Sequence, residues 1–137
     1  MHLELLKSLN FTEIGTINTV DGKVVFDITD PDYDVKQDNP SVYAWVETDT
    51  VKYIGKAGKG IRKRLKEHTQ GWNGGSVTGI RKANYISESV LRTGKPIRLF
   101  GRRCDVVRCF GIAVSNISTE ESALIKLLDP DWNVEGK

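Results

Sequence analysis

The stretch "SVYAWVETDTVKYIGKAGKGIRKRLKEH", residues 41–68, changes from the pattern of a β-strand to that of a helix. Its first half alternates apolar and polar residues on either side of Asp49-Thr50, which predicts two paired antiparallel strands joined by a turn. Beyond the glycines of "KAGKG" the apolar residues recur at helical spacing. The stretch therefore predicts two tyrosines, Tyr43 and Tyr53, on neighbouring strands, with a helix rich in lysine and arginine directly behind them.

The chain before this stretch predicts a short helix and a hairpin. Residues 3–9 have apolar residues at helical spacing. Residues 13–28, "EIGTINTVDGKVVFDI", alternate around Asp21-Gly22, a dipeptide that favours a tight turn with positive φ. An acidic loop bounded by prolines then leads to residue 41.

The chain after it predicts helices and further strands. Apolar residues spaced from residue 80 predict a helix that ends at "TGKP", and the stretches "PIRLF" and "VVRCFGIAV" predict strands. Residues 118–128 predict a last helix, opened by Ser118 and closed by Asp129-Pro130. This order of elements predicts an α+β domain built on a small antiparallel sheet.

The composition of the 137-residue chain is that of one globular domain, with 39% hydrophobic and 28% charged residues. Cys104 and Cys109 have no second pair, which excludes a zinc-site spacing and a disulfide framework. No apolar run has the length of a membrane span, and the N-terminus lacks the pattern of a secretion signal. We therefore expect a cytoplasmic protein that does not bind membranes.

The net charge of +2 conceals a strong asymmetry along the chain. Residues 1–51 carry 3 Lys/Arg and 10 Asp/Glu, a net charge of −7, whereas residues 52–108 carry 15 and 3, a net charge of +12. Residues 109–137 carry 2 and 5, a net charge of −3. The middle segment is thus a candidate for binding a polyanion such as nucleic acid.

Tyrosine, arginine and histidine in one neighbourhood suit the hydrolysis of a phosphodiester. A phenol can deprotonate or orient water, a guanidinium can neutralise charge that develops on the phosphate, and an imidazole can relay a proton. A divalent metal is the remaining requirement. Mg²⁺ prefers hard oxygen ligands, and one or two carboxylates are enough when water and substrate phosphate complete its shell.

Four motifs in the right order resemble the GIY-YIG nuclease family. "SVY" and "YIG" stand at the two name-giving motifs and supply Tyr43 and Tyr53. "IRKRLKEH" resembles the helix in which an arginine precedes a histidine by four residues, here Arg64 and His68. "EESALIKLLDPDWN" resembles the last helix and ending, with a metal-binding glutamate at Glu121, a Leu-Ile pair and a terminal Pro-x-Trp-Asn.

The resemblance covers about residues 41–133. It implies a small three-stranded antiparallel sheet flanked by helices, so that residues 1–40 form an N-terminal helix and β-hairpin extension packed on a nuclease domain of residues 41–137. It also implies an endodeoxyribonuclease that hydrolyses double-stranded DNA with one Mg²⁺ (or Mn²⁺) ion per active site. The stand-alone restriction and phage enzymes of the family are the most similar, which implies a bacterial cell or a phage-infected host.

The resemblance assigns roles to particular residues. Glu121 would hold the metal, and Tyr43 would act as general base, directly or through a histidine. The implied catalytic residues are Tyr43, Tyr53, Arg64, His68, Glu121 and Asn133, the last of which would position a phosphate. Phosphate contacts along the DNA are expected from Lys56, Arg62, Lys63, Lys66, Arg81, Lys82, Arg102 and Arg103.

Two of these assignments compete with a second interpretation of the same residues. Ser118 and Glu121 make the pattern S-x-x-E, so Glu121 could instead be the reciprocal partner in a capping box. One extra residue in "KAGKG" makes Arg62 an alternative to Arg64. Ser41 stands where the name-giving glycine would be, which leaves the chemistry of the following tyrosine intact.

The activity and the assembly of the whole protein are also open at this point. The two tyrosines could be simple packing residues, and the domain could be a non-catalytic or RNA-directed nucleic-acid-binding domain. If the protein does cut both DNA strands, we expect a homodimer or homotetramer, because one site with one metal cuts one strand at a time. Residues 1–40 are acidic and would be repelled by DNA, so we expect them to form the subunit contacts.

Overall fold

The computed structural model describes residues 2–133. These residues form α1 (His2–Ser8), β1 (Thr12–Val20), β2 (Lys23–Ile28), β3 (Ser41–Glu47), β4 (Thr50–Ala57) and α2 (Ile61–Gln70). A short π-helical turn η1 (Gly71–Gly75) leads to α3 (Val77–Thr93), β5 (Ile97–Arg103), β6 (Val106–Cys109), β7 (Ile112–Ser115) and α4 (Ile117–Leu128).

Strands β1 to β5 form one antiparallel sheet in the order β2-β1-β5-β3-β4. The predicted hairpin β1–β2 is present, and Asp21 and Gly22 in its turn both have positive φ, 52° and 78°. It is not a separate layer packed on a three-stranded sheet, because β1 pairs with β5 and lengthens the sheet from three strands to five. The α+β class is confirmed.

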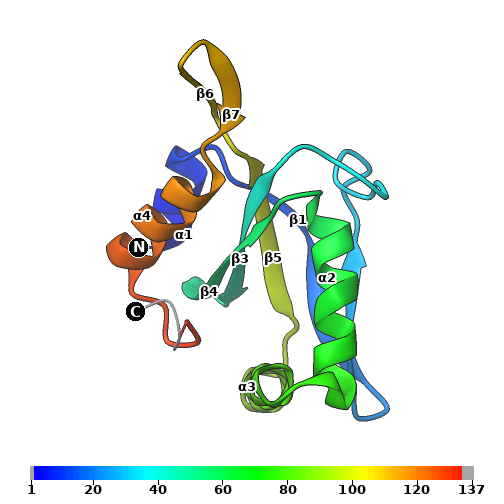
Figure 1. The fold of residues 1–137 in the computed structure, drawn as a ribbon. Helices are drawn as coiled ribbons and strands as arrows, with labels where there is room; N and C mark the ends of the chain where they lie inside the picture. Colours follow the sequence, from blue (N-terminus) through cyan, green and yellow to red (C-terminus); the bar gives the residue numbers. More distant parts are fainter. Residues whose placement is uncertain (1, 134–137) are drawn as a thin grey trace.

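Helices cover both faces of this sheet, α1 and α4 on one face and α2 and α3 on the other (Figure 1). Strand β3 lies between β5 and β4 and is buried on both sides. Successive residues of a strand point to opposite faces. Tyr43 and Trp45 accordingly join the core beneath α2 and α3, whereas Val42 and Ala44 join the core beneath α1 and α4. Tyr43 is thereby fixed against α2.

The residues paired with Tyr43 on both neighbouring strands are glycines. Its partners in the sheet are Gly55 on β4 and Gly101 on β5. A Cβ atom on Gly55 would lie 2.3 Å from the phenol ring of Tyr43, and one on Gly101 would lie 2.5 Å from Cδ1 of Ile61. The glycine of "YIG" is therefore required because the tyrosine ring lies across β4 at that point.

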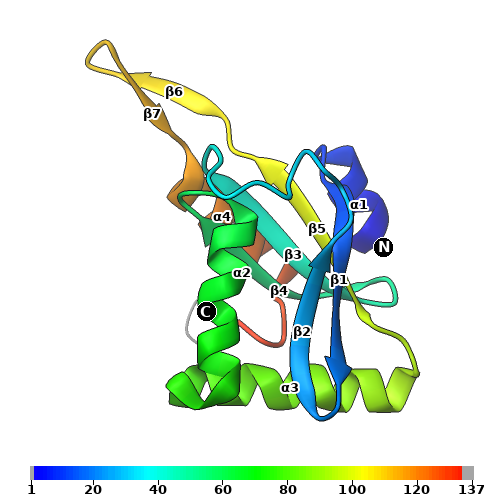
Figure 2. The same cartoon turned by 90° about the vertical axis from the view of Figure 1, so that its right-hand side faces the viewer.

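Two expectations for the C-terminal half are wrong. The stretch "VVRCFGIAV" is not one strand, because it turns at Phe110 and Gly111, with φ of 53° and 78°, and forms the hairpin β6–β7. This hairpin projects from the body of the protein (Figures 1 and 2). Helix α4 has Asn116 as its N-cap, without a side-chain cap bond, so Ser118 is not the cap. The helix is instead entered through Asn116, with φ of −92° and ψ of 24°, directly after β7.

None of the helices within residues 2–133 has both the length and the apolar character that crossing a bilayer requires.

The packing of Tyr43 predicts that Gly55→Ala destabilises the protein. The added methyl group has no space beside the phenol ring, so we expect the free energy of unfolding to fall by about 1–3 kcal/mol. Gly58→Ala is the matched control, because a Cβ atom there meets nothing within 4 Å. Urea unfolding of both variants tests this, and equal stabilities would contradict the packing.

Candidate active site

A cleft of about 370 Å³ opens beside the edge strand β4, between α2 and α4. It collects side chains that are up to 78 positions apart in the chain. Its lining residues are Tyr43, Tyr53, Lys56, Gly58, Arg64, Glu67, Ile117 and Glu121. Four of the six predicted catalytic residues therefore line one cleft, and His68 lies directly behind it.

The Tyr43 hydroxyl lies 2.6 Å from Nε2 of His68 in the buried interior. Burial, together with the positive charges of Arg64 and Lys82, lowers the pKa of His68 from 6.5 to about 3. Burial also raises the pKa of the Tyr43 phenol well above its usual value, although Arg64 opposes this shift. At neutral pH both groups are uncharged, and with the ring proton of His68 on Nδ1 the phenol donates its hydrogen bond to Nε2.

Lys82 of α3 orients the Tyr53 side chain. Lys82 Nζ donates a hydrogen bond of 3.0 Å to the Tyr53 hydroxyl and lies 4.6 Å from the centroid of its ring. The rings of Tyr53 and Tyr43 are 6.2 Å apart, which confirms that the paired strands bring the two phenols into one neighbourhood. Because Lys82 occupies an acceptor lone pair, the Tyr53 hydroxyl proton is directed elsewhere.

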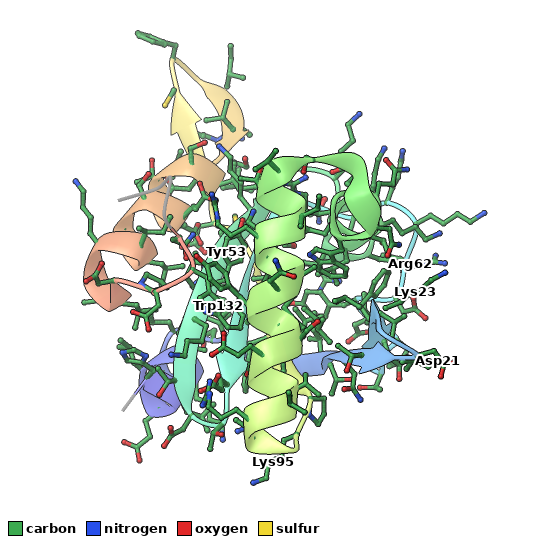
Figure 3. The ribbon with its side chains drawn as sticks, turned by 90° about the horizontal axis from the view of Figure 1, so that it is seen from below. Asp21, Lys23, Tyr53, Arg62, Lys95 and Trp132 are labelled. Atoms are coloured by element: carbon green, nitrogen blue, oxygen red, sulfur yellow. The ribbon has the colours of Figure 1, made fainter. Side chains whose placement is uncertain are left out.

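Arg64 and Arg62 point to different places. Arg64 lines the cleft, and its Nη1 lies 3.2 Å from Oε1 of Glu67. Arg62 Nε instead lies 3.2 Å from Oδ1 of Asp34, and Figure 3 shows Arg62 and Tyr53 on opposite sides of α3. The extra residue in "KAGKG" thus leaves Arg64 as the arginine beside the tyrosines. Glu67 was not expected from the sequence, although its spacing of three residues from Arg64 on a helix is a usable signal.

Glu121 is the carboxylate that α4 brings to the cleft. Its Oε1 lies 4.0 Å from Nζ of Lys56, which also donates a hydrogen bond of 3.2 Å to Oγ of Ser118. Burial raises the pKa of Glu121, while the cations Lys56, Arg64 and Lys82 oppose the shift. Because Ser118 binds this lysine and does not cap α4, the capping box does not explain Glu121.

Glu120, the neighbouring carboxylate, faces another part of the protein. It accepts a hydrogen bond of 2.7 Å from the backbone N–H of Asp105, and its Oε1 lies 3.3 Å from Nη2 of Arg102. Glu120 therefore holds the base of the β6–β7 hairpin, and the two glutamates have separable roles.

The oxygen donors of the cleft fit a hydrated Mg²⁺ ion. Residues 2–133 contain no group of three or more His, Cys, Asp or Glu side chains that could enclose a metal. The half-buried carboxylate of Glu121 does lie in the cleft beside the two phenols. One carboxylate is sufficient for Mg²⁺ where water and substrate phosphate supply the other ligands.

The structure gives Asn133, which the resemblance assigned to a phosphate, a part in holding β4. Its Oδ1 accepts a hydrogen bond of 2.8 Å from the N–H of Ile54, and its Nδ2 donates one of 2.7 Å to the C=O of the same residue. The adjacent Trp132 donates its backbone N–H to the C=O of Lys52 and stacks on Tyr85. Because the amide is buried and hydrogen-bonded to both backbone groups of Ile54, Asn133 holds the edge of β4.

Two expected DNA contacts are held by carboxylates of the protein itself. Arg102 bonds the C=O of Leu9 and pairs with Asp105 and Glu120. Arg103 pairs with Asp38 at 3.0 Å and lies over the ring of Tyr33. These arginines join segments of the fold, and their expected contact with DNA stays a prediction.

The other six expected DNA contacts occupy three places. Lys56 lines the cleft and Lys82 binds Tyr53 beside it, while Arg81 lies half-buried on α3. Arg62, Lys63 and Lys66 line a separate hollow on the outer side of α2.

Comparison with known proteins shows a relative in sequence. The chain is 29% identical to Endonuclease II of enterobacteria phage T4 over 100 residues, which are 70% of this chain and 73% of that protein. No established protein-family profile matches the chain.

Two solved structures have the same fold. A mutant of bacteriophage T4 EndoII superposes with a TM-score of 0.72 at 22% identity, over 98% of this chain and 100% of that one. Restriction endonuclease Hpy188I in complex with product DNA superposes with a TM-score of 0.55 at 18% identity, over 92% and 76% of the two chains. The resemblance to nucleases that the motifs predicted is confirmed.

The buried, neutral His68 predicts a loss of stability in mild acid. Its pKa falls from 6.5 in the unfolded chain to about 3 in the folded protein. The unfolded chain therefore takes up a proton first, and this contribution to stability, on the order of 4 kcal/mol, is present above pH 6.5 and lost between pH 6.5 and about 3.

His68→Gln removes this titration, so the unfolding free energy of the variant should fall less steeply over that pH range than that of the wild type. Parallel pH profiles for His68→Gln and the wild type would contradict a buried neutral histidine.

Proposed function

We propose that this protein is a Mg²⁺-dependent (or Mn²⁺-dependent) endonuclease that hydrolyses phosphodiester bonds of double-stranded DNA. The observation that carries the proposal is the single cleft that contains two phenols, Arg64 and Glu121, with a neutral imidazole behind one phenol. The similarity to Endonuclease II and to a restriction endonuclease supports it. The biological role of such an endonuclease would be either restriction or phage-type degradation of host DNA.

Tyr43 and His68 form the proton-handling side of the proposed reaction. A water molecule in the cleft gives its proton to the Tyr43 hydroxyl as that hydroxyl gives its own proton to Nε2 of His68. The phenol need not ionise first, which matters because burial raises its pKa. An anionic phosphodiester beside Arg64 and Lys82 offsets the two charges that lower the pKa of His68, so substrate binding itself improves the base.

Arg64, Glu67 and Glu121 form the electrostatic side. Arg64 neutralises the charge that builds up on the phosphate in the transition state, and Glu67 fixes the position of its guanidinium. Glu121 would hold the metal ion, with its carboxylate kept ionised by Lys56 against the effect of burial. When bound, Mg²⁺ would polarise the scissile phosphate and stabilise the leaving oxygen.

A supercoiled plasmid tests the proposal directly. Incubation with the protein should give nicked or linear DNA in the presence of Mg²⁺ or Mn²⁺, and intact plasmid in the presence of a chelator. Binding without cleavage would support the non-catalytic domain instead, and cleavage of RNA alone would support the RNA-directed one.

We propose that the active form is a homodimer or homotetramer, because cutting both strands needs two sites. Within the N-terminal region, β1 is enclosed between β2 and β5, so β2 alone of these strands keeps a free edge for a subunit contact. Light scattering should give a mass of two or four chains. A monomer that linearises plasmid with no nicked intermediate would contradict this.

The two neighbouring glutamates provide a test of the metal site. Glu121→Gln should lower the cleavage rate by about 100-fold or more, because it removes the carboxylate that would hold the ion, and it should leave DNA affinity within about threefold. Glu120→Gln is the matched control and should lose stability at the hairpin base while it still cuts. An inactive Glu120 variant beside an active Glu121 variant would assign the metal to Glu120 in place of Glu121.

The two arginines of α2 provide a second test. Arg64→Ala should lower the single-turnover rate by about 100-fold at saturating DNA, because the transition-state charge is no longer neutralised. Arg62→Ala loses an exposed pair with Asp34 and should keep that rate within about threefold. The reverse result would move the catalytic arginine to Arg62.

A further inference from the structure

We propose that one DNA strand leaves the cleft along the N-terminal half of α2, and that Lys36, Lys63 and Lys66 together hold a backbone phosphate outside the catalytic site. This inference rests on the proposed function and adds a second phosphate site to it. Lys36 belongs to the acidic loop between β2 and β3. The net negative charge of this loop, taken alone, would predict that the loop lies away from DNA.

Three hollows join into one track across this part of the surface. A hollow of about 140 Å³ shares Gly58, Arg64 and Glu67 with the catalytic cleft. A further hollow of about 250 Å³ shares Lys63 with it and ends against Lys36 and Lys66. A strand whose scissile phosphate lies beside Arg64 is thus led over the start of α2 towards the loop between β2 and β3.

The charges along the track favour an anion. Within residues 2–133, Lys36, Lys63 and Lys66 make no ion pair with a carboxylate, whereas most arginines of the same region do. Arg62 lines the same hollow, and Asp34 neutralises it at 3.2 Å. Three unneutralised ammonium groups around one hollow form a site for a phosphate of the DNA backbone.

Two of the four carboxylates of the acidic loop, those of Asp34 and Asp38, are paired with arginines of the protein itself. Asp38 pairs with Arg103 and its backbone N–H donates to the C=O of Lys59. Asp34 pairs with Arg62 on the wall of the hollow. These contacts hold the loop against α2, and Lys36 and Gln37 line the hollow from this loop. The negative charge counted in the sequence is therefore not the charge that a strand would meet here.

The dimensions suit several nucleotides. Helix α2 has 10 residues and so is about 15 Å long, whereas each strand of DNA places a phosphate about every 3.4 Å along the duplex axis. A strand that follows the track therefore reaches the lysine site a few phosphates away from the scissile one.

Binding measurements with matched charge changes test the inference. Glu121→Gln serves as the parent, so that a duplex of about 25 base pairs is bound without being cut. Lys36→Gln/Lys66→Gln is compared with Lys7→Gln/Lys95→Gln, which removes one lysine of α1 and one that follows the C-terminal end of α3 (Lys95 in Figure 3). Fluorescence anisotropy gives Kd at several salt concentrations, and thermal unfolding checks that every variant is folded.

The Lys36/Lys66 pair should weaken binding by about tenfold or more and lower the slope of log K against log salt by about 0.9 to 1.8, since it removes one or two phosphate contacts. The Lys7/Lys95 pair should change Kd by less than about threefold and leave the slope unchanged. Equal effects of the two pairs would overturn the track, as would no effect of the first pair. An effect on duplex RNA alone would overturn the assignment to DNA. A parent that binds no DNA would refute the proposed function itself.

Discussion

The hydrogen bond between Tyr43 and His68 is the interaction on which the rest of the site depends. It joins β3 to α2, and its 2.6 Å length leaves little tolerance for either element to shift. Two indole rings enclose the imidazole, Trp45 with its centroid at 5.1 Å and Trp72 stacked at 5.7 Å. Water is kept from this side of the pair, so both groups stay neutral.

The edge position of β4 explains how residues from both faces of the sheet reach one cleft. Helix α2 covers one face and α4 the other, and only at an edge can side chains from the two layers meet without crossing the sheet. Such an edge would normally be open to pairing with another chain. Here the segment after α4 covers the edge. The side chain of Asn133 forms hydrogen bonds with the backbone of Ile54, and the backbone N–H of Trp132 donates one to the C=O of Lys52. The residue expected to touch substrate thus has a role in placing the strand that carries Tyr53.

Much of this arrangement follows from local sequence. The alternation before residue 47 and the helical spacing after residue 60 are enough to place Tyr43, Arg64 and His68, because strands and helices present side chains at fixed periods. The path of α4 was not predictable in the same way. Ser118 fits a cap by pattern, yet the hairpin that precedes it delivers the chain into the helix at Asn116. The roles of Asn133 and Arg103 were beyond the sequence for a different reason, because each is decided by a partner far away in the chain, at separations of 79 and 65 residues.

The Tyr43 hydroxyl, on the proposed mechanism, takes part in the chemistry and is not there for packing alone. Tyr43→Phe keeps the ring between its two glycines and removes only the oxygen that contacts His68. Its single-turnover rate on duplex DNA with Mg²⁺ is the most direct measurement, with Tyr85→Phe as the control outside the cleft. We predict a loss of about 100-fold or more for Tyr43→Phe in a protein that remains folded, and near-wild-type activity for Tyr85→Phe. A folded Tyr43→Phe variant that cuts as fast as the wild type would contradict the mechanism.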